Sequence, residues 1–110
     1  MNLFRLTMLA AFALGISAVA RANAGPDSQR QAEILYLLRH DCGSCHGMRL
    51  EGGLGPPLTP PALSRLSNEQ IVATILYGRP GTPMPPWHPF LSPEEAHWLA
   101  GKLRQGATTR

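Results

Sequence analysis

The sequence has no run of basic residues, and Lys102 is the only lysine among its 110 residues. A domain that binds nucleic acid normally gathers Lys and Arg into a patch, so the formal net charge of +3 is no evidence for such a partner. The sequence also lacks a continuous apolar stretch of about 20 residues, which a transmembrane helix needs. Only two cysteines are present, which excludes a zinc site built from two cysteine pairs.

The longest apolar stretch lies near the N-terminus, over residues 6–20, and follows a basic residue. It is about 15 residues long and leads to Ala22 and Ala24, small residues that signal peptidase accepts at positions −3 and −1. This pattern predicts a secretory signal peptide over residues 1–24 and one exported mature domain, residues 25–110. An uncleaved N-terminal anchor is the alternative. Loss of the two leader arginines lowers the net charge from +3 to +1.

The mature domain is small and holds all 11 of the chain's prolines and most of its 11 glycines. Domains of this size often need a disulfide, a metal or a cofactor to support the core. A disulfide between Cys42 and Cys45 would stabilise the fold little, because closing so short a loop removes little chain entropy.

Three helical segments are predicted, with no strand and no internal repeat, so the expected fold is all-α. The first begins at Asp27 or Ser28 and runs to about Arg39, the second covers residues 67–78, and the third covers residues 92–103. Apolar spacing places one side of each helix in the core. The residues on these sides are Ile34, Leu37 and Leu38, then Ile71, Val72, Ile75 and Leu76, then Ala96, Leu99, Ala100 and Leu103.

The second and third helices also carry start and stop signals. Ser67 with Gln70 and Ser92 with Glu95 form capping-box patterns, and Gly78 predicts the end of the second helix.

Two segments rich in Pro and Gly, residues 47–66 and 78–91, are expected to be irregular. The second holds five prolines, which limit its backbone freedom and keep it stiff. A flexible linker is the alternative, but helix signals bracket the segment closely on both sides. We expect a loop that packs on the domain and has a function.

The run CGSCH contains both cysteines, Cys42 and Cys45, followed directly by His46. This spacing matches C-x-x-C-H, the attachment pattern of covalently bound haem c, in which the histidine reaches the iron. A thioredoxin-like dithiol would need a preceding strand, which the sequence does not predict. A zinc site would need four ligands, for which His40 and His88 are available.

A haem that carries electrons favours a second axial ligand, and a thioether raises its reduction potential. The candidates in the mature chain are Met48, Met84, His40, His88 and His97. Met48 lies too close to His46 to reach the other face of a haem. Met84 lies in the stiff proline-rich loop and is the preferred ligand, with His88 in reserve.

These motifs together resemble those of the small class I c-type cytochromes. The resemblance covers nearly the whole mature chain and rests on CGSCHG, on GPPL at residues 55–58, on TPMPPW at residues 82–87, and on LSPEEAHWL at residues 91–99. It implies a fold of a few helices around one haem, with the first and last helices crossing.

The resemblance also implies a role for each matching residue. Cys42 and Cys45 correspond to the two thioether links, His46 to the proximal iron ligand and Met84 to the distal one. Pro56 corresponds to a proline whose carbonyl oxygen accepts the other N–H of the proximal histidine.

Two positions depart from the class I pattern where the crossing helices meet. Ile34 stands where a small residue is usual, and Lys102 stands where an aromatic residue is usual. Trp98, one turn earlier, is expected to supply the aromatic contact.

A narrower likeness links the chain to the short monohaem cytochromes encoded beside the cytochrome cd-type nitrite reductase of denitrifying bacteria. It implies a monomeric periplasmic electron carrier, not an enzyme, that takes electrons from an upstream donor and passes them to nitrite reductase. The alternatives are an accessory role in haem d maturation, a carrier for another reductase or oxidase, a ligand-binding haem protein and a thiol oxidoreductase. Four arginines flank the expected haem segments and are candidates to contact propionates or a partner: Arg39, Arg49, Arg65 and Arg79.

Overall fold

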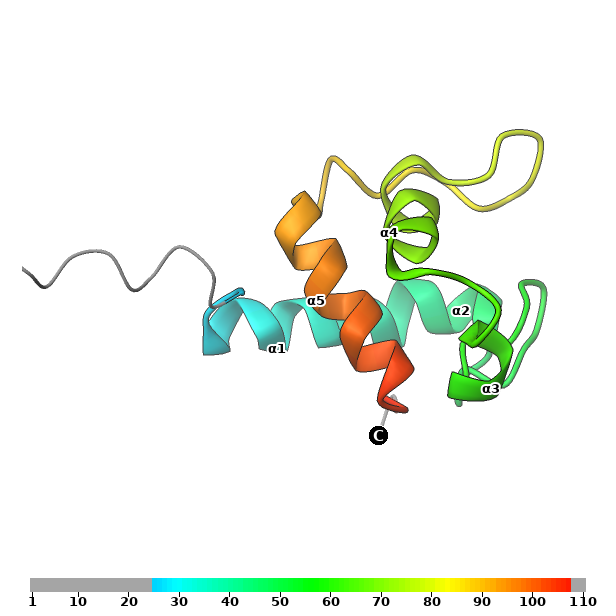
Figure 1. Cartoon of the computed structure of the whole chain (residues 1–110), viewed down its shortest axis with the longest axis horizontal. Helices are drawn as coiled ribbons and strands as arrows, with labels where there is room; N and C mark the ends of the chain where they lie inside the picture. The colour runs from blue at the N-terminus through cyan, green and yellow to red at the C-terminus, as the bar shows by residue number, and fades with distance from the viewer. Residues whose placement is uncertain (1–24, 108–110) are drawn as a thin grey trace, which may run out of the picture.

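The structure, a computed structural model, describes residues 25–107 of the chain. Within this range it contains helices and loops and no strand, which confirms the predicted all-α class (Figure 1). None of the helices in the described range is long and apolar enough to cross a membrane. The predicted signal peptide, residues 1–24, lies outside the described residues, as do residues 108–110.

The three predicted helices are all present, together with additional helical segments. In chain order the elements are α1 (Ser28–Leu37), the π-helical segment η1 (Leu38–Cys42), α2 (Gly43–His46), α3 (Pro60–Leu63), α4 (Asn68–Tyr77) and α5 (Pro93–Arg104). The predicted helices correspond to α1, α4 and α5.

The first helical run is longer than predicted. The prediction ends it at about Arg39, but α1 passes through η1 into α2, so that helical structure continues to His46. Cys42 and Gly43 keep right-handed helical angles, and the chain leaves the helix only at Gly47, where φ is +94°. The cysteine motif is therefore itself helical. Short π-helical segments within helices often occur at functional sites.

The short helix α3 lies inside residues 47–66, which the prediction treats as irregular. Pro60 and Pro61 occupy its first turn, where a missing backbone N–H removes no intrahelical bond. Leu63 at its end is buried. A helix of four residues has too few hydrogen bonds to form alone, so packing of Leu63 supports it.

Both predicted capping boxes are present. The Ser67 hydroxyl accepts the Gln70 N–H at 3.1 Å, and the Gln70 side-chain oxygen accepts the Ser67 N–H at 2.8 Å. Ser92 and Glu95 form the same reciprocal pair at α5. Gly78 ends α4 with φ at +67°, in the left-handed region that favours glycine.

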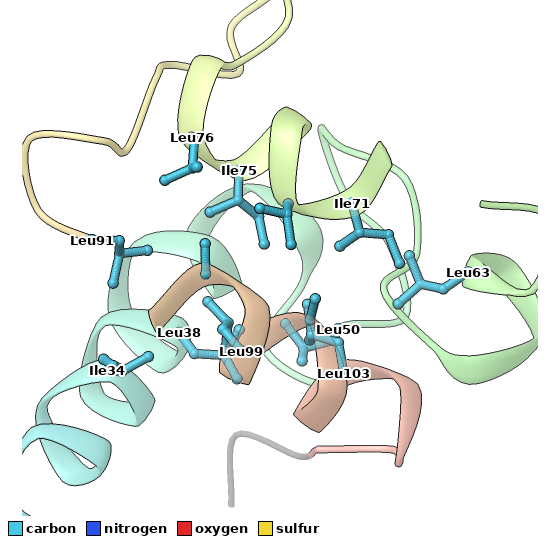
Figure 2. Close-up of a cluster of buried hydrophobic side chains, with 13 residues drawn as sticks. Ile34, Leu38, Leu50, Leu63, Ile71, Ile75, Leu76, Leu91, Leu99 and Leu103 are labelled. Atoms are coloured by element: carbon cyan, nitrogen blue, oxygen red, sulfur yellow. The ribbon is translucent and has the colours of Figure 1, made fainter. Parts of the chain in front are cut away.

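The core forms where α4 and α5 pack together over the first helical run (Figure 2). Its buried hydrophobic residues are Ile34, Leu38, Leu50, Leu63, Ile71, Val72, Ile75, Leu76, Leu91, Ala96, Leu99, Ala100 and Leu103. All the apolar residues predicted for α4 and α5 are among them. Fully burying one Leu or Ile side chain contributes about 1.5–3 kcal/mol, so this cluster is the main source of stability.

The two positions that depart from the class I pattern lie at different depths. Ile34 is 1% exposed and lies in the same buried cluster as Leu99, so the domain accommodates the larger side chain (Figure 2). Lys102 is half-buried, with its ammonium nitrogen 5.4 Å from the centre of the Trp98 ring. A β-carbon on Gly25 would lie 3.4 Å from Trp98 Cδ1. Trp98 therefore packs beside the segment that leads into α1.

An ion pair joins α1 to α5. Arg30 Nε lies 2.7 Å from Glu95 Oε1, and Arg30 Nη2 lies 3.0 Å from Glu95 Oε2, which makes the contact bidentate. Arg30 also binds Glu33 at 2.9 Å and donates to the Phe90 carbonyl at 2.6 Å. The hydrogen bond from Arg30 is the largest of the effects that lower the pKa of Glu95.

The substitution Glu95→Gln tests this ion pair, because it removes the charge and keeps a capping-box oxygen. We expect the free energy of unfolding at pH 7 to fall by about 1 kcal/mol, as for a partly exposed pair. The pKa of Glu95 is lower in the folded than in the unfolded state, so the contribution is present above the unfolded carboxyl pKa of about 4.3 and disappears as the pH falls through the folded value. Denaturant titrations at pH 7 and at acidic pH measure both effects.

The matched control is Glu94→Gln, on the same turn of α5 and exposed. An equal loss in this control, or a difference between wild type and Glu95→Gln that does not change with pH, would contradict the assignment.

Candidate functional site

A cavity of about 690 Å³ lies between the cysteine motif, the following loop, α3, α4 and the loop after α4. Its volume falls within the range of about 300–1,000 Å³ typical of small-molecule and cofactor sites. Much of its wall is apolar and includes Leu54, Leu58, Leu66, Ile71 and Trp87. The cavity therefore suits a large ligand with extensive apolar surface.

Cys42 and Cys45 both line this cavity from the end of the first helical run. They are free thiols, half-buried and about one helical turn apart. The Ser44 hydroxyl donates to the Asp41 carbonyl at 2.7 Å and so binds the backbone of the motif. The cavity thus has two thiols on its wall, with His46 directly after the second.

Burial raises the pKa of the Cys42 thiol to about 11, and the negative charge of Asp41 adds to the shift. Cys42 is therefore a neutral thiol at physiological pH in the folded chain. A redox-active dithiol instead needs a cysteine whose pKa is lowered, so that a thiolate forms. Together with the absence of a strand from residues 25–107, this makes the site unlike that of a thiol oxidoreductase.

His46 is oriented by the loop that follows it. Its Nδ1 lies 2.7 Å from the carbonyl oxygen of Pro56. A carbonyl oxygen only accepts, so this bond places the imidazole proton on Nδ1 and leaves the lone pair on Nε2. A metal-ligating histidine commonly has this arrangement, in which the hydrogen bond fixes the ring and increases its basicity.

The loop reaches His46 because Gly55 has no side chain. A β-carbon on Gly55 would lie 2.7 Å from His46 Cε1 and 2.8 Å from Nδ1, which is too close for any side chain. The Gly55 N–H also donates to the Cys45 carbonyl at 2.7 Å, and the Gly52 N–H donates to the His46 carbonyl at 2.8 Å. This close contact does not follow from the GPPL motif alone, since it depends on how the loop folds back on α2.

Met84 lines the same cavity from the loop after α4, together with Thr82, Pro83 and Pro85. It is half-buried, whereas Met48 is 65% exposed and does not line the cavity. The structure therefore brings Met84 together with the cysteine motif and leaves Met48 outside.

The other candidate ligands lie away from the cavity wall. His40 and His88 are exposed and pack beside Tyr36 and Tyr77, with ring centres 4.1 and 6.3 Å apart. His97 is exposed on α5. No group of three or more His, Cys, Asp or Glu side chains in the described part of the chain is arranged to hold a metal ion. This argues against the zinc alternative.

Of the four flanking arginines, Arg65 and Arg79 line the cavity. Arg39 and Arg49 are exposed and are not part of its wall. Two cationic groups thus line a mainly apolar cavity. A ligand with carboxylate groups needs such partners, because an unpaired charge beside an apolar wall is costly.

Comparison with known proteins identifies the family. A family model described as cytochrome c oxidase, cbb3-type, subunit III, matches residues 29–101. Cytochrome c55X of Pseudomonas aeruginosa is 56% identical over 85 residues, which are 77% of this chain and 71% of that protein. The chain belongs to the c-type cytochromes. The solved structure of the c-type cytochrome NirC matches this cytochrome with a TM-score of 0.72 and 58% identity, over 74% of this chain and 95% of that one.

A larger protein is also similar to this cytochrome. Dihydro-heme d1 dehydrogenase of Pseudomonas aeruginosa is 45% identical over 76 residues, which are 69% of this chain and only 14% of that protein. The similarity is therefore to a domain-sized part of the dehydrogenase.

The cytochrome is an electron-transfer protein that binds haem c covalently. Bound haem c supplies an iron that gains and loses one electron. The residues present fit this group: the cavity is large and mainly apolar, two free thiols line it, and Gly55 opens room for the loop beside His46.

The substitution Gly55→Ala tests the contact between His46 and Pro56. The added methyl group must displace the ring or the loop, so we expect the Nδ1 proton of His46 to exchange with solvent about fivefold faster, as for the loss of one hydrogen bond. Proton NMR of the haem-loaded protein measures this rate. Gly101→Ala is the matched control, since no atom lies within 4 Å of its β-carbon position. Unchanged exchange in Gly55→Ala would show that the close contact does not support the bond.

Proposed function

We propose that this cytochrome is a monomeric periplasmic electron carrier that delivers electrons to a nitrite reductase. In this proposal Cys42 and Cys45 attach the haem, while His46 and Met84 are the axial iron ligands. The pattern of a signal peptide in residues 1–24 supports the periplasmic location. The likeness to cytochromes encoded beside nitrite reductase supports the partner.

One observation carries the site assignment. Two thiols, a histidine and a methionine, from segments far apart in the chain, all line one cavity. The hydrogen bond from His46 Nδ1 to Pro56 leaves Nε2 available as a ligand atom, which favours His46 for the proximal role. Met84 offers a weak thioether donor from a loop that prolines make stiff, which favours it for the distal role.

The two arginines that line the cavity support the proposal that it binds haem. Arg65 and Arg79 can neutralise the two haem propionates, which would otherwise place negative charge beside an apolar wall. A small, transient contact at the cavity rim is sufficient for electron exchange with a partner.

Substitution of Met84 tests the distal assignment. We expect Met84→His to lower the reduction potential by on the order of 0.1 V or more, since axial ligands change haem potentials over about 0.8 V. Met84→Ala should remove the methionine–iron charge-transfer band and allow carbon monoxide to bind at neutral pH. Optical spectroscopy and redox titration measure these changes.

Met48→Ala is the matched control, because Met48 is exposed and lies outside the cavity. It should leave the spectrum and the potential unchanged. Wild-type protein that binds carbon monoxide readily at neutral pH would contradict the assignment of Met84 and support a ligand-binding haem protein.

A second candidate function is an accessory role in haem d maturation. It is favoured by the similarity to part of dihydro-heme d1 dehydrogenase, whose name states an oxidation of a haem d1 precursor. In this role the cytochrome would accept the electrons released by such an oxidation.

Deleting the gene separates the two functions. We expect the deletion strain to contain normal amounts of haem d and to reduce nitrite more slowly, with the rate restored by adding the purified reduced cytochrome to periplasmic extract. The haem d content of isolated nitrite reductase and its rate of reduction in stopped-flow mixing are the two measurements. A loss of haem d with normal electron delivery would instead support the maturation role.

A further inference from the structure

The end of α4 approaches the Met84 segment more closely than a side chain at Gly78 would allow. A β-carbon on Gly78 would lie 2.5 Å from the Met84 carbonyl oxygen, 2.7 Å from the Pro85 carbonyl carbon and 2.9 Å from the Pro86 nitrogen. All three are backbone atoms, so no side-chain rotation can relieve the conflict. The loop itself would have to move.

Hydrogen bonds hold the loop in this position on both sides of Met84. The Arg79 N–H donates to the Met84 carbonyl at 3.1 Å. Beyond Met84, the Trp87 N–H donates to the Ile75 carbonyl at 3.0 Å, and the next residue donates likewise to α4. The loop thereby supplies partners for carbonyl groups that the end of a helix leaves unsatisfied.

The loop has little freedom to absorb a displacement elsewhere. Pro83, Pro85 and Pro86 fix their own φ angles and restrict the residues that precede them. The Thr82 hydroxyl adds a further restraint, since it donates to the Arg79 carbonyl at 2.7 Å. A shift of the Met84 carbonyl therefore moves its side chain, which lines the cavity.

We propose that Gly78 is a positioning residue that sets the place of the Met84 side chain in the cavity by letting the loop backbone lie directly on the end of α4. The functional consequence rests on the proposed role of Met84 as the distal ligand. Any β-carbon at position 78 pushes the Met84 carbonyl away from α4 and with it the thioether sulfur.

The substitution Gly78→Ala in the haem-loaded protein tests this proposal through two independent readouts. We expect Arg79 amide exchange to become about fivefold faster or more, because its bond to the Met84 carbonyl is lost. We also expect loss of the methionine–iron charge-transfer band and a fall in reduction potential, because a thioether ligand raises the potential. Hydrogen-exchange NMR reports the loop position and does not depend on the ligand assignment.

Gly81→Ala is the matched control. Gly81 lies in the same loop and also has a positive φ, +80°, but no atom lies within 4 Å of its β-carbon position. Gly81→Ala therefore also places an alanine at a positive φ, but without the contact, and should keep the band, the potential and slow Arg79 exchange. Gly78→Asn is a second test, because it adds the same β-carbon with a different side chain. At φ +67° and ψ −166°, position 78 lies in a backbone region that neither Ala nor Asn favours, so both variants combine backbone strain with the contact.

The outcomes separate the two proposals. If wild-type protein lacks the methionine–iron band, the role of Met84 as a ligand fails, while Arg79 exchange still tests the position of the loop. If both Gly78 variants keep slow exchange and a normal spectrum, or if Gly81→Ala changes as much as they do, the positioning role is overturned. It is also overturned if both Gly78 variants fail to fold while Gly81→Ala folds, since Gly78 would then serve folding alone.

Discussion

Two close contacts of the backbone determine the geometry of the cavity, one beside His46 and one beside Met84. At one, the loop after α2 reaches the ring of His46 because Gly55 has no β-carbon. At the other, the loop after α4 lies on the helix end at Gly78. In each contact a glycine without a side chain lets a neighbouring functional side chain, His46 or Met84, take its position. The residues that set the geometry are therefore distinct from those that carry the chemistry.

The core and the cavity adjoin and share Leu63 and Ile71, but they are stabilised mainly by different means. The core is a cluster of aliphatic side chains, mainly from the first helical run, α4 and α5 (Figure 2). The Arg30–Glu95 pair adds a polar contact between α1 and α5. The cavity is built mostly by loops, which hydrogen bonds and prolines hold against that frame. Stability and cofactor geometry can therefore be changed separately, by substitutions on α5 and in the loops respectively.

Local sequence signals predicted much of this arrangement. Capping boxes and apolar spacing located α4 and α5, because both signals act within a few residues. The C-x-x-C-H spacing and the proline-rich setting of Met84 also selected residues that the structure brings to one cavity. The haem-binding character follows from the family, whereas the individual ligand roles stay predictions.

The features that the sequence did not reveal depend on contacts between distant segments. Helical structure continues to His46 although the cysteine motif contains no strong helix-forming run. Helix α3 exists because Leu63 finds a place in the core, and Arg30 pairs with Glu95 only once α1 and α5 are side by side. The contacts of Gly55 and Gly78 likewise depend on where the two loops fold.

The prolines around the cavity have a consequence for contacts with other proteins. Pro56, Pro57, Pro83 and Pro85 line the cavity and are all exposed. Proline has no backbone N–H, so a protein that touches these residues finds no amide donors there and forms few directional bonds with them. Contact with these prolines would therefore depend on apolar packing more than on hydrogen bonds. Few directional bonds suit the small, transient contacts by which electron-transfer proteins exchange electrons.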